Sequence, residues 1–181
     1  MNYTGKLLIA HPNLVQNYFE RSVIYICHDD PKTGSQGLIL NKPSTYTVGD
    51  ISTMKGFPSD LGELVRKGGP VRDKAICILH TTEWYSSNTV SAGQYSISSD
   101  QLMLEKISMY NTPRNWRIFS GICTWAPQQL DLEVKGITPY SENLSWLTLD
   151  AYDNIVFGPD GKDQWISAVN ACSQQAIKDY F

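Results

Sequence analysis

The stretch SVIYICHDDPKTGSQGLIL, residues 22–40, decides the fold class of this chain. Its first part, SVIYICH at Ser22–His28, is rich in β-branched and aromatic residues, which is typical of a buried β-strand. The polar run DDPKTG at Asp29–Gly34 has the composition of a turn. The apolar run GLIL at Gly37–Leu40 predicts the returning strand, so the stretch predicts two strands joined by a turn.

The rest of the chain alternates irregularly between strand and helix patterns. Further strands are expected at Gly5–Ala10, Ala75–Thr81, Tyr95–Ile97, Arg117–Cys123, Trp146–Leu149 and Ile155–Phe157. Helices are expected after the cap Ser98–Asp100, over Gln128–Lys135 with Gly136 as its C-terminal cap, and over Asp163–Gln175. Ser44–Asp60 and Glu83–Ala92 are interpreted as loops, with a helical turn at Leu61–Val65. This irregular order indicates an α+β fold rather than a doubly wound sheet.

Composition and charge exclude several classes of protein. The chain has 181 residues, 41% hydrophobic and 18% charged, which is typical of a folded chain and not of a disordered one. The length predicts a single domain over residues 1–181. A formal charge of −3 gives no general attraction to nucleic acid or to an anionic membrane. The apolar run Leu7–Ala10 is too short for a signal peptide, and no run approaches the roughly 20 residues that span a bilayer. We therefore expect a cytoplasmic protein with no membrane partner.

The cysteines and histidines are the first candidates for chemistry. Cys27, Cys77, Cys123 and Cys172 form no Cys-x-x-Cys pair, so neither structural zinc nor a disulfide is expected. His28 and His80 each end an apolar strand, and they could approach one another if those strands are neighbours. Such a pair would suit acid–base chemistry, a weak metal site or another ligand, whereas the simplest interpretation is a hydrogen bond to a loop carbonyl. We predict no metal and no cofactor.

Two further groups of polar residues are candidate sites. RKGGPVRDK at 66–74 places four cations around a glycine turn, where open amides and positive charge could bind an anion. The alternative is a solvated hairpin end in which Asp73 offsets part of the charge. Gln129 and Glu133 project from one face of a predicted helix, with Trp125 as a packing anchor before it. Here the alternative is the ordinary solvent side of an amphipathic helix.

The motifs of several enzyme classes are missing. The chain lacks the phosphate-binding run Gly-x-x-x-x-Gly-Lys-Ser/Thr, and Gly68-Gly69 is too short for a dinucleotide fingerprint. Ser120-Gly121 lacks the first glycine of a nucleophile elbow. We therefore predict no catalytic residue.

Several short stretches follow one another in order over residues 5–167. They are GKLLIA with Pro12, FERSVIY, His28, GLILNKP, GGPV, Leu79-His80, and Gly121-x-x-x-Trp-x-Pro-x-Gln-Leu-x-x-Glu133. Together they resemble the YqgE/AlgH family. The resemblance implies a bacterial-type α+β protein with a curved, bifurcated or barrel-like mixed sheet and flanking helices. The family has no established reaction, and one branch has been named as transcriptional regulators. The chain departs from the family pattern at Thr124, Ala126 and Gln128, where the family tends to have glycine.

The resemblance and the residue patterns together give a set of ligand-binding candidates. They are Arg21, Ser22, His28, Asn41, Gly68, Gly69, Pro70, Arg72, His80, Trp125, Gln129 and Glu133. The favoured function is a non-catalytic binding or regulatory module that acts through a protein partner or a small ligand. The alternative is a small-molecule or nucleotide-binding enzyme whose pocket uses His28, His80, Gln129 and Glu133. A transcriptional regulator comes third, because no basic face that would bind nucleic acid is evident.

Overall fold

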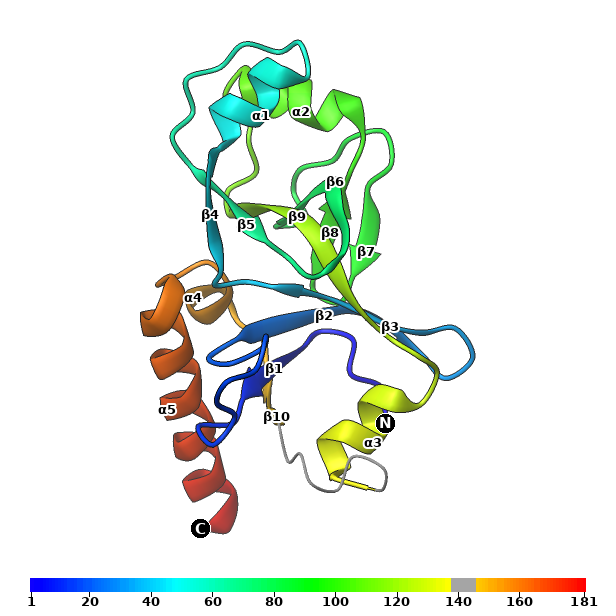
Figure 1. Ribbon diagram of the computed structural model, residues 1–181, viewed down its shortest axis with the longest axis vertical. Helices are drawn as coiled ribbons and strands as arrows, with labels where there is room; N and C mark the ends of the chain where they lie inside the picture. Colours follow the sequence, from blue (N-terminus) through cyan, green and yellow to red (C-terminus); the bar gives the residue numbers. More distant parts are fainter. Residues whose placement is uncertain (138–145) are drawn as a thin grey trace.

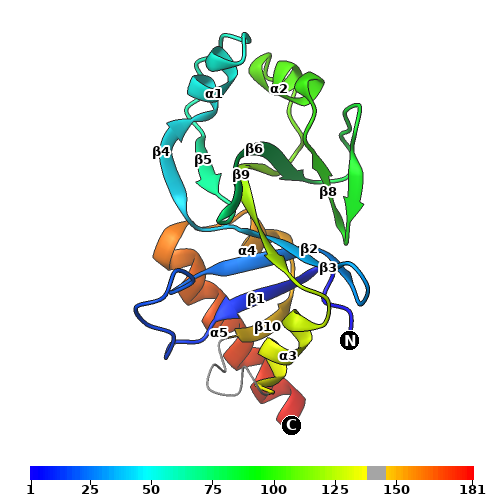
Figure 2. The same ribbon diagram turned by 45° about the vertical axis from the view of Figure 1, so that its right-hand side comes forward.

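The computed structural model describes residues 1–137 and 146–181, as ten strands and five helices. The strands are β1 (Lys6–Ala10), β2 (Val23–Asp30), β3 (Gly34–Ile39), β4 (Pro43–Thr47), β5 (Leu64–Lys67), β6 (Val71–His80), β7 (Val90–Ala92), β8 (Tyr95–Ser98), β9 (Trp116–Trp125) and β10 (Trp146–Asp150). The helices are α1 (Val48–Met54), α2 (Gln101–Ser108), α3 (Gln129–Lys135), α4 (Asp153–Val156) and α5 (Gly161–Tyr180). Figures 1 and 2 place α1 and α2 at one end of the molecule and α3 and α5 at the other.

The sheet divides at β9, which takes part in both of its halves. The last residues of β9, Cys123–Trp125, pair with β3, whereas the rest of the strand pairs with β6. The strand order is β10-β1-β2-β3-β9-β6-β8-β7, with β5 also paired to β9 and β4 to β5. All pairs are antiparallel except β5 with β9, so the sheet is mixed. The predicted α+β fold with a curved, bifurcated mixed sheet is confirmed.

The β2 strand is apolar throughout because both of its faces are covered. Val23 and Tyr25 point into the core that α4 and α5 cover, whereas Ile24 and Ile26 point into a second core beside α3. Successive strand residues point to opposite faces, so a strand between two cores needs apolar residues at every position. A third core lies between the other half of the sheet and the helices α1 and α2. The continuous apolar pattern of SVIYIC follows from this placement.

The chain passes very close to itself where the turn after β5 crosses β9. A Cβ atom on Gly69 would lie 2.1 Å from the backbone carbon of Ile122, and one on Gly68 would lie 2.4 Å from the carbonyl oxygen of Gly121. Gly121 itself has a φ of +80°, a conformation that only glycine adopts readily. Glycine is therefore required here by backbone packing.

Four of the predicted segments have a different structure. Glu83–Ala92, expected as a loop, ends in the strand β7. Ser44–Asp60, expected as a loop, contains most of β4 and all of α1, which starts with a capping box between Thr47 and Asp50. Leu61–Val65, expected as a helical turn, leads into the strand β5 instead. Ile155–Phe157, expected as a strand, lies mostly in the one-turn helix α4. The elements in these segments have only three to seven residues, too few to show a period, so a few apolar residues fit either structure.

The helices that were predicted with a cap are confirmed. Asp100 caps α2, and Gly136, in the left-handed conformation, ends α3.

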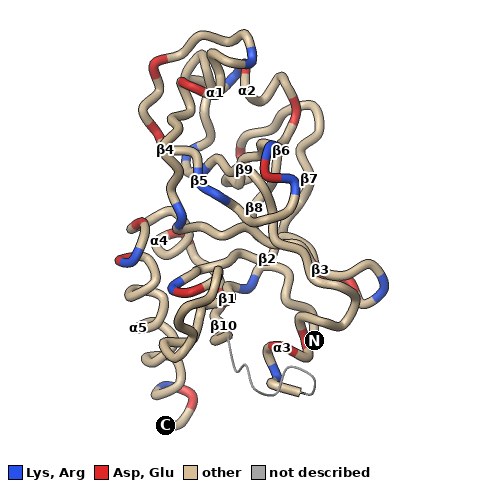
Figure 3. The backbone as a smooth tube through the Cα atoms, in the orientation of Figure 1, with Lys and Arg blue, Asp and Glu red and all other residues tan. Residues whose placement is uncertain are grey.

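In the described parts of the chain, no helix is both long and apolar enough to cross a membrane. Lys and Arg gather where β5 leads into β6, and charges of both signs are scattered over the rest of the described chain (Figure 3).

Candidate functional site

A cleft of about 230 Å³ opens between the end of β9, the helix α3 and the start of β10. Aromatic and apolar side chains make most of its wall, among them Phe19, Val71, Trp125 and Trp146. Its polar side chains come mainly from β9 and α3 and include Thr124, Gln129 and Glu133. We call this feature the tryptophan cleft.

Among the residues that the structure describes, three donors hold the carboxylate of Glu133. Its Oε2 accepts hydrogen bonds from the indole Nε1 atoms of Trp125 and Trp146, each at 3.1 Å. Its Oε1 accepts one from Nε2 of Gln129 at 2.8 Å, and Oε1 of Gln129 accepts one from the backbone N–H of Ala126 at 3.0 Å. Because Gln129 and Glu133 are four residues apart, they lie side by side on α3. The network therefore fixes a negative charge in one orientation within the cleft.

The predicted candidates are only partly brought together. Pro70, Trp125, Gln129 and Glu133 all line the tryptophan cleft. Trp146 was missed, although it donates to Glu133 as Trp125 does. A tryptophan at the first residue of a predicted strand was the available signal, but its partner on α3 is set by tertiary structure.

His28 and His80 do not share a pocket with Gln129 and Glu133. His80 is fully buried, with Nδ1 2.8 Å from the Thr81 carbonyl and Nε2 2.9 Å from Oγ of Ser98. It pairs with Trp116 at one end of β9, whereas the cleft lies at the other end. His28 is exposed and lies 3.4 Å from Oγ1 of Thr33. The enzyme pocket predicted from these four residues is therefore not formed.

Burial also determines the protonation of the histidine and of the one thiol in the cleft. Burial lowers the pKa of His80, and because the Thr81 carbonyl only accepts, Nδ1 carries the proton. The thiol of Cys123 lines the cleft, and burial raises its pKa to about 12. A nucleophilic cysteine needs a thiolate, so Cys123 stays an unreactive thiol near neutral pH. In the ranges 1–137 and 146–181, no three His, Cys, Asp or Glu side chains are grouped to hold a metal ion.

Asn41 joins the start of β2 to the start of α5. Its Oδ1 accepts from the backbone N–H of Val23 at 2.9 Å, and its Nδ2 donates to the carbonyls of Arg21 at 2.8 Å and Gly161 at 2.9 Å. The neighbouring Ser22 is fully buried. These contacts give Asn41 a structural role. The backbone of Arg21 takes part in the same set of hydrogen bonds.

The predicted anion site around the glycine turn lacks two of its elements. The backbone N–H of Gly68 donates to the Ser120 carbonyl at 2.8 Å, so this amide is not open. The side chain of Arg66 is buried and already paired with Glu63 and Asp160, so its charge is not open to an anion. Arg72 remains exposed at a φ of +50°. The turn is explained by the crossing with β9 rather than by a cradle for a ligand.

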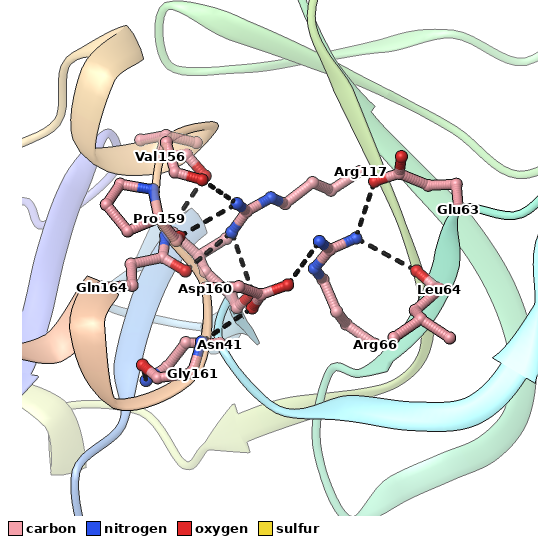
Figure 4. Close-up of polar contacts among 12 residues, drawn as sticks. Asn41, Glu63, Leu64, Arg66, Arg117, Val156, Pro159, Asp160, Gly161 and Gln164 are labelled. Atoms are coloured by element: carbon pink, nitrogen blue, oxygen red, sulfur yellow. Dashed lines mark hydrogen bonds and ion pairs between the residues drawn. The ribbon is translucent and has the colours of Figure 1, made fainter.

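Arg117 on β9 is a buried residue that the sequence did not single out. Its Nη1 donates to Oε1 of Gln164 at 2.7 Å and to the Leu40 carbonyl at 3.2 Å. Its Nη2 donates to the carbonyls of Gly158 at 2.7 Å and Pro159 at 3.1 Å (Figure 4). Burial, and then the neighbouring charge of Arg66, lower the pKa of Arg117 to about 10, so the guanidinium stays charged at neutral pH. Arg117 thus ties the segment between α4 and α5 to the sheet.

Arg66 on β5 extends this tie toward solvent. Its Nη2 lies 2.6 Å from Oδ2 of Asp160, and its Nη1 lies 3.1 Å from Oε1 of Glu63 and from the Leu64 carbonyl (Figure 4). Asp160 is also the N-terminal cap of α5. The two arginines and these two carboxylates balance in charge, and the cluster links β5 and β9 to the segment between α4 and α5.

The fold and the cleft together define an α+β protein with a curled, half-barrel sheet and a small cleft with a fixed carboxylate. The sequence pattern of the AlgH-like family (DUF179) matches residues 7–176, and the chain belongs to this family. The resemblance stated from the sequence is thereby confirmed.

Relatives with similar sequences are uncharacterised bacterial proteins. A UPF0301 protein of Xanthomonas oryzae pv. oryzae is 34% identical over 170 residues, covering 91% of this chain and 86% of the relative. A UPF0301 protein of Ruegeria pomeroyi is 34% identical over 184 residues, covering 98% and 95%. Among solved structures, the AlgH protein of Pseudomonas aeruginosa matches with a TM-score of 0.76 at 22% identity, over 94% of this chain and 89% of that one. A protein of Corynebacterium diphtheriae matches with a TM-score of 0.69 at 21% identity, over 92% and 85%. These two likenesses concern the fold alone.

Proposed function

We propose that this chain is a non-catalytic binding protein and that its partner or ligand docks in the tryptophan cleft. The observation that carries the proposal is the Glu133 carboxylate, which two indole N–H groups and Gln129 hold in place inside an aromatic cleft. A few fixed polar groups within an apolar wall are what binding sites generally have. The protonated thiol of Cys123 supports a binding role over nucleophilic catalysis.

The size of the cleft favours a small group or a protein side chain over a nucleotide. Pockets that hold drug-sized ligands measure roughly 300–1,000 Å³, and the tryptophan cleft measures about 230 Å³. The formal charge of −3 favours partners other than nucleic acid. We propose further that the protein acts in the cytoplasm as a single domain and needs no cofactor.

The proposal is tested by filling the cleft. Thr124 is an exposed strand residue among those that line the cleft, so Thr124→Trp places a bulky side chain at its edge with little change to the core. Thr82→Trp is the matched control, because Thr82 is exposed and follows His80 at the far end of β9. Both variants and the parent are used as bait in extracts of the native host, and retained proteins and small molecules are quantified by mass spectrometry.

We expect the parent and Thr82→Trp to retain the same molecules and Thr124→Trp to lose at least one of them. Retention of an identical set by all three baits would contradict a binding role for the cleft. Circular dichroism of each variant checks that the fold is intact, since a misfolded bait would lose its partners for an unrelated reason.

A further inference from the structure

We propose that the tryptophan cleft receives the side chain of a lysine or arginine from a protein partner. This inference rests on the proposed function and adds the chemistry of the occupant. Glu133 is the only Asp, Glu, Lys, Arg or His among the described residues that line the cleft. Its three donors are neutral N–H groups, which stabilise the anion without cancelling its charge. A carboxylate has roughly four lone-pair sites, and the described residues fill three of them, which leaves one for an incoming donor within the part of the chain that the structure describes.

The aromatic wall adds a second reason for a cation. Ammonium and guanidinium groups are attracted to the faces of aromatic rings, most strongly to tryptophan. Phe19 packs edge-on against Trp146, with ring centroids 5.6 Å apart. The same aromatic group already holds a cation of this chain, because Nζ of Lys42 lies 4.1 Å from the ring centroid of Tyr18 and 6.0 Å from that of Phe19. Lys42 also donates to the Tyr18 carbonyl, and it is not one of the residues that line the cleft.

The surroundings of the cleft favour a protein over a free amine. The segment between β1 and β2 contributes Phe19 to the cleft, and it also carries Val15 at 61% exposure and Tyr18 at 50%. Val71, on the other side, is 36% exposed. Exposed apolar and aromatic side chains around a charged cleft are typical of a surface that a protein partner covers. A free amine would leave these side chains in water.

The occupant is tested with short peptides by NMR. The probes are acetylated, amidated peptides that share one sequence with alanine, valine and tyrosine flanks and differ only at the central residue, which is arginine, lysine, citrulline or glutamate. Citrulline has nearly the shape of arginine without its charge. The indole N–H signals of Trp125 and Trp146 report on the cleft directly, because both groups bind Glu133. Agmatine, a free guanidinium compound, is the fifth probe.

Two variants separate charge at the cleft from charge in general. Glu133→Gln keeps an acceptor oxygen for the indoles and removes the negative charge, and an indole spectrum with its dispersion intact shows that the cleft is still formed. Glu105→Gln removes the same charge from an exposed position on α2, in a different part of the molecule.

We expect the arginine and lysine peptides to shift both indole signals, with at least tenfold weaker binding for the citrulline and glutamate peptides. We also expect Glu133→Gln to weaken the arginine peptide at least tenfold and Glu105→Gln to leave it unchanged. Equal affinities for the arginine and citrulline peptides would overturn the proposal that the occupant is a cation, and so would an unchanged affinity of Glu133→Gln for the arginine peptide. Either result would leave the cleft as a binding site. Agmatine binding as tightly as the arginine peptide would overturn the protein source. If no probe of any charge moves an indole signal at millimolar concentration, the occupant proposal fails, and the bait experiment with Thr124→Trp then decides the proposed function separately.

Discussion

Replacing Arg117 by methionine is expected to destabilise the fold by about 3 kcal/mol. The guanidinium donates four hydrogen bonds, to Gln164 and to the carbonyls of Leu40, Gly158 and Pro159. Each buried acceptor left without a donor costs about 1 kcal/mol or more, which gives at least about 4 kcal/mol for the set. Methionine no longer requires the burial of a charge, and this returns part of that cost. The net loss therefore falls near the lower end of the roughly 3–5 kcal/mol seen when buried ionic networks are broken.

Urea unfolding followed by tryptophan fluorescence measures this loss of unfolding free energy. The midpoints of the parent and the variant are compared, provided that both unfold with the same dependence on urea concentration. Arg114→Met is the matched control, since Arg114 is exposed and lies three residues before Arg117. We expect the control to stay within about 0.5 kcal/mol of the parent. Hydrogen exchange should also show earlier opening at the start of α5, because Arg117 holds the segment before it. A loss below about 1 kcal/mol for Arg117→Met would refute the view that this arginine ties α5 to the sheet.

Three further predictions concern single positions. Burial lowers the pKa of His80, so the unfolded chain takes up a proton at this residue before the folded chain does, and the folded state loses stability as the pH falls below about 6.5. His80→Gln should therefore flatten the fall of the urea midpoint between about pH 6.5 and 5.5. An equally steep fall in the variant would contradict this. Gln128 has a φ of +67° and makes no capping hydrogen bond, so Gln128→Gly should stabilise by about 0.5–1 kcal/mol in the same assay, and a net loss would count against strain there. Gly69→Ala should cost at least about 3 kcal/mol or prevent folding, because its Cβ would lie 2.1 Å from Ile122; a normal melting temperature would show that the crossing is looser than described.

Local patterns predicted the features that depend on neighbours in sequence. The apolar run SVIYIC predicted β2. The cap Asp100 predicted the start of α2, and the cap Gly136 predicted the end of α3. The pairing of Gln129 with Glu133 also follows from their spacing of four residues. Each of these depends on fewer than ten residues of chain, so its physical cause is visible without tertiary structure.

Contacts between distant segments could not be predicted in this way. Arg117 looks like a charge at the edge of the strand pattern RIFSGIC, but its partners lie in the segments around Leu40 and Pro159. His28 and His80 both end apolar runs, yet β2 and β6 are separated by β3 and β9 in the sheet. Strand order is set by long-range pairing, and no single-residue pattern encodes it. The alternative of a histidine pair is wrong for that reason, whereas the simplest interpretation, a hydrogen bond to a backbone carbonyl, holds for His80.

The departures from the family pattern before α3 have different consequences at each position. Thr124 is an exposed residue of β9 among those that line the cleft. The backbone N–H of Ala126 is already bound by Gln129, and Gln128 carries a strained backbone that a glycine would relieve. A ligand held by open amides at the start of α3 is therefore disfavoured in this chain. We therefore expect the proposed recognition to depend on the side chains of the tryptophan cleft, where the fixed carboxylate of Glu133 supplies the charge.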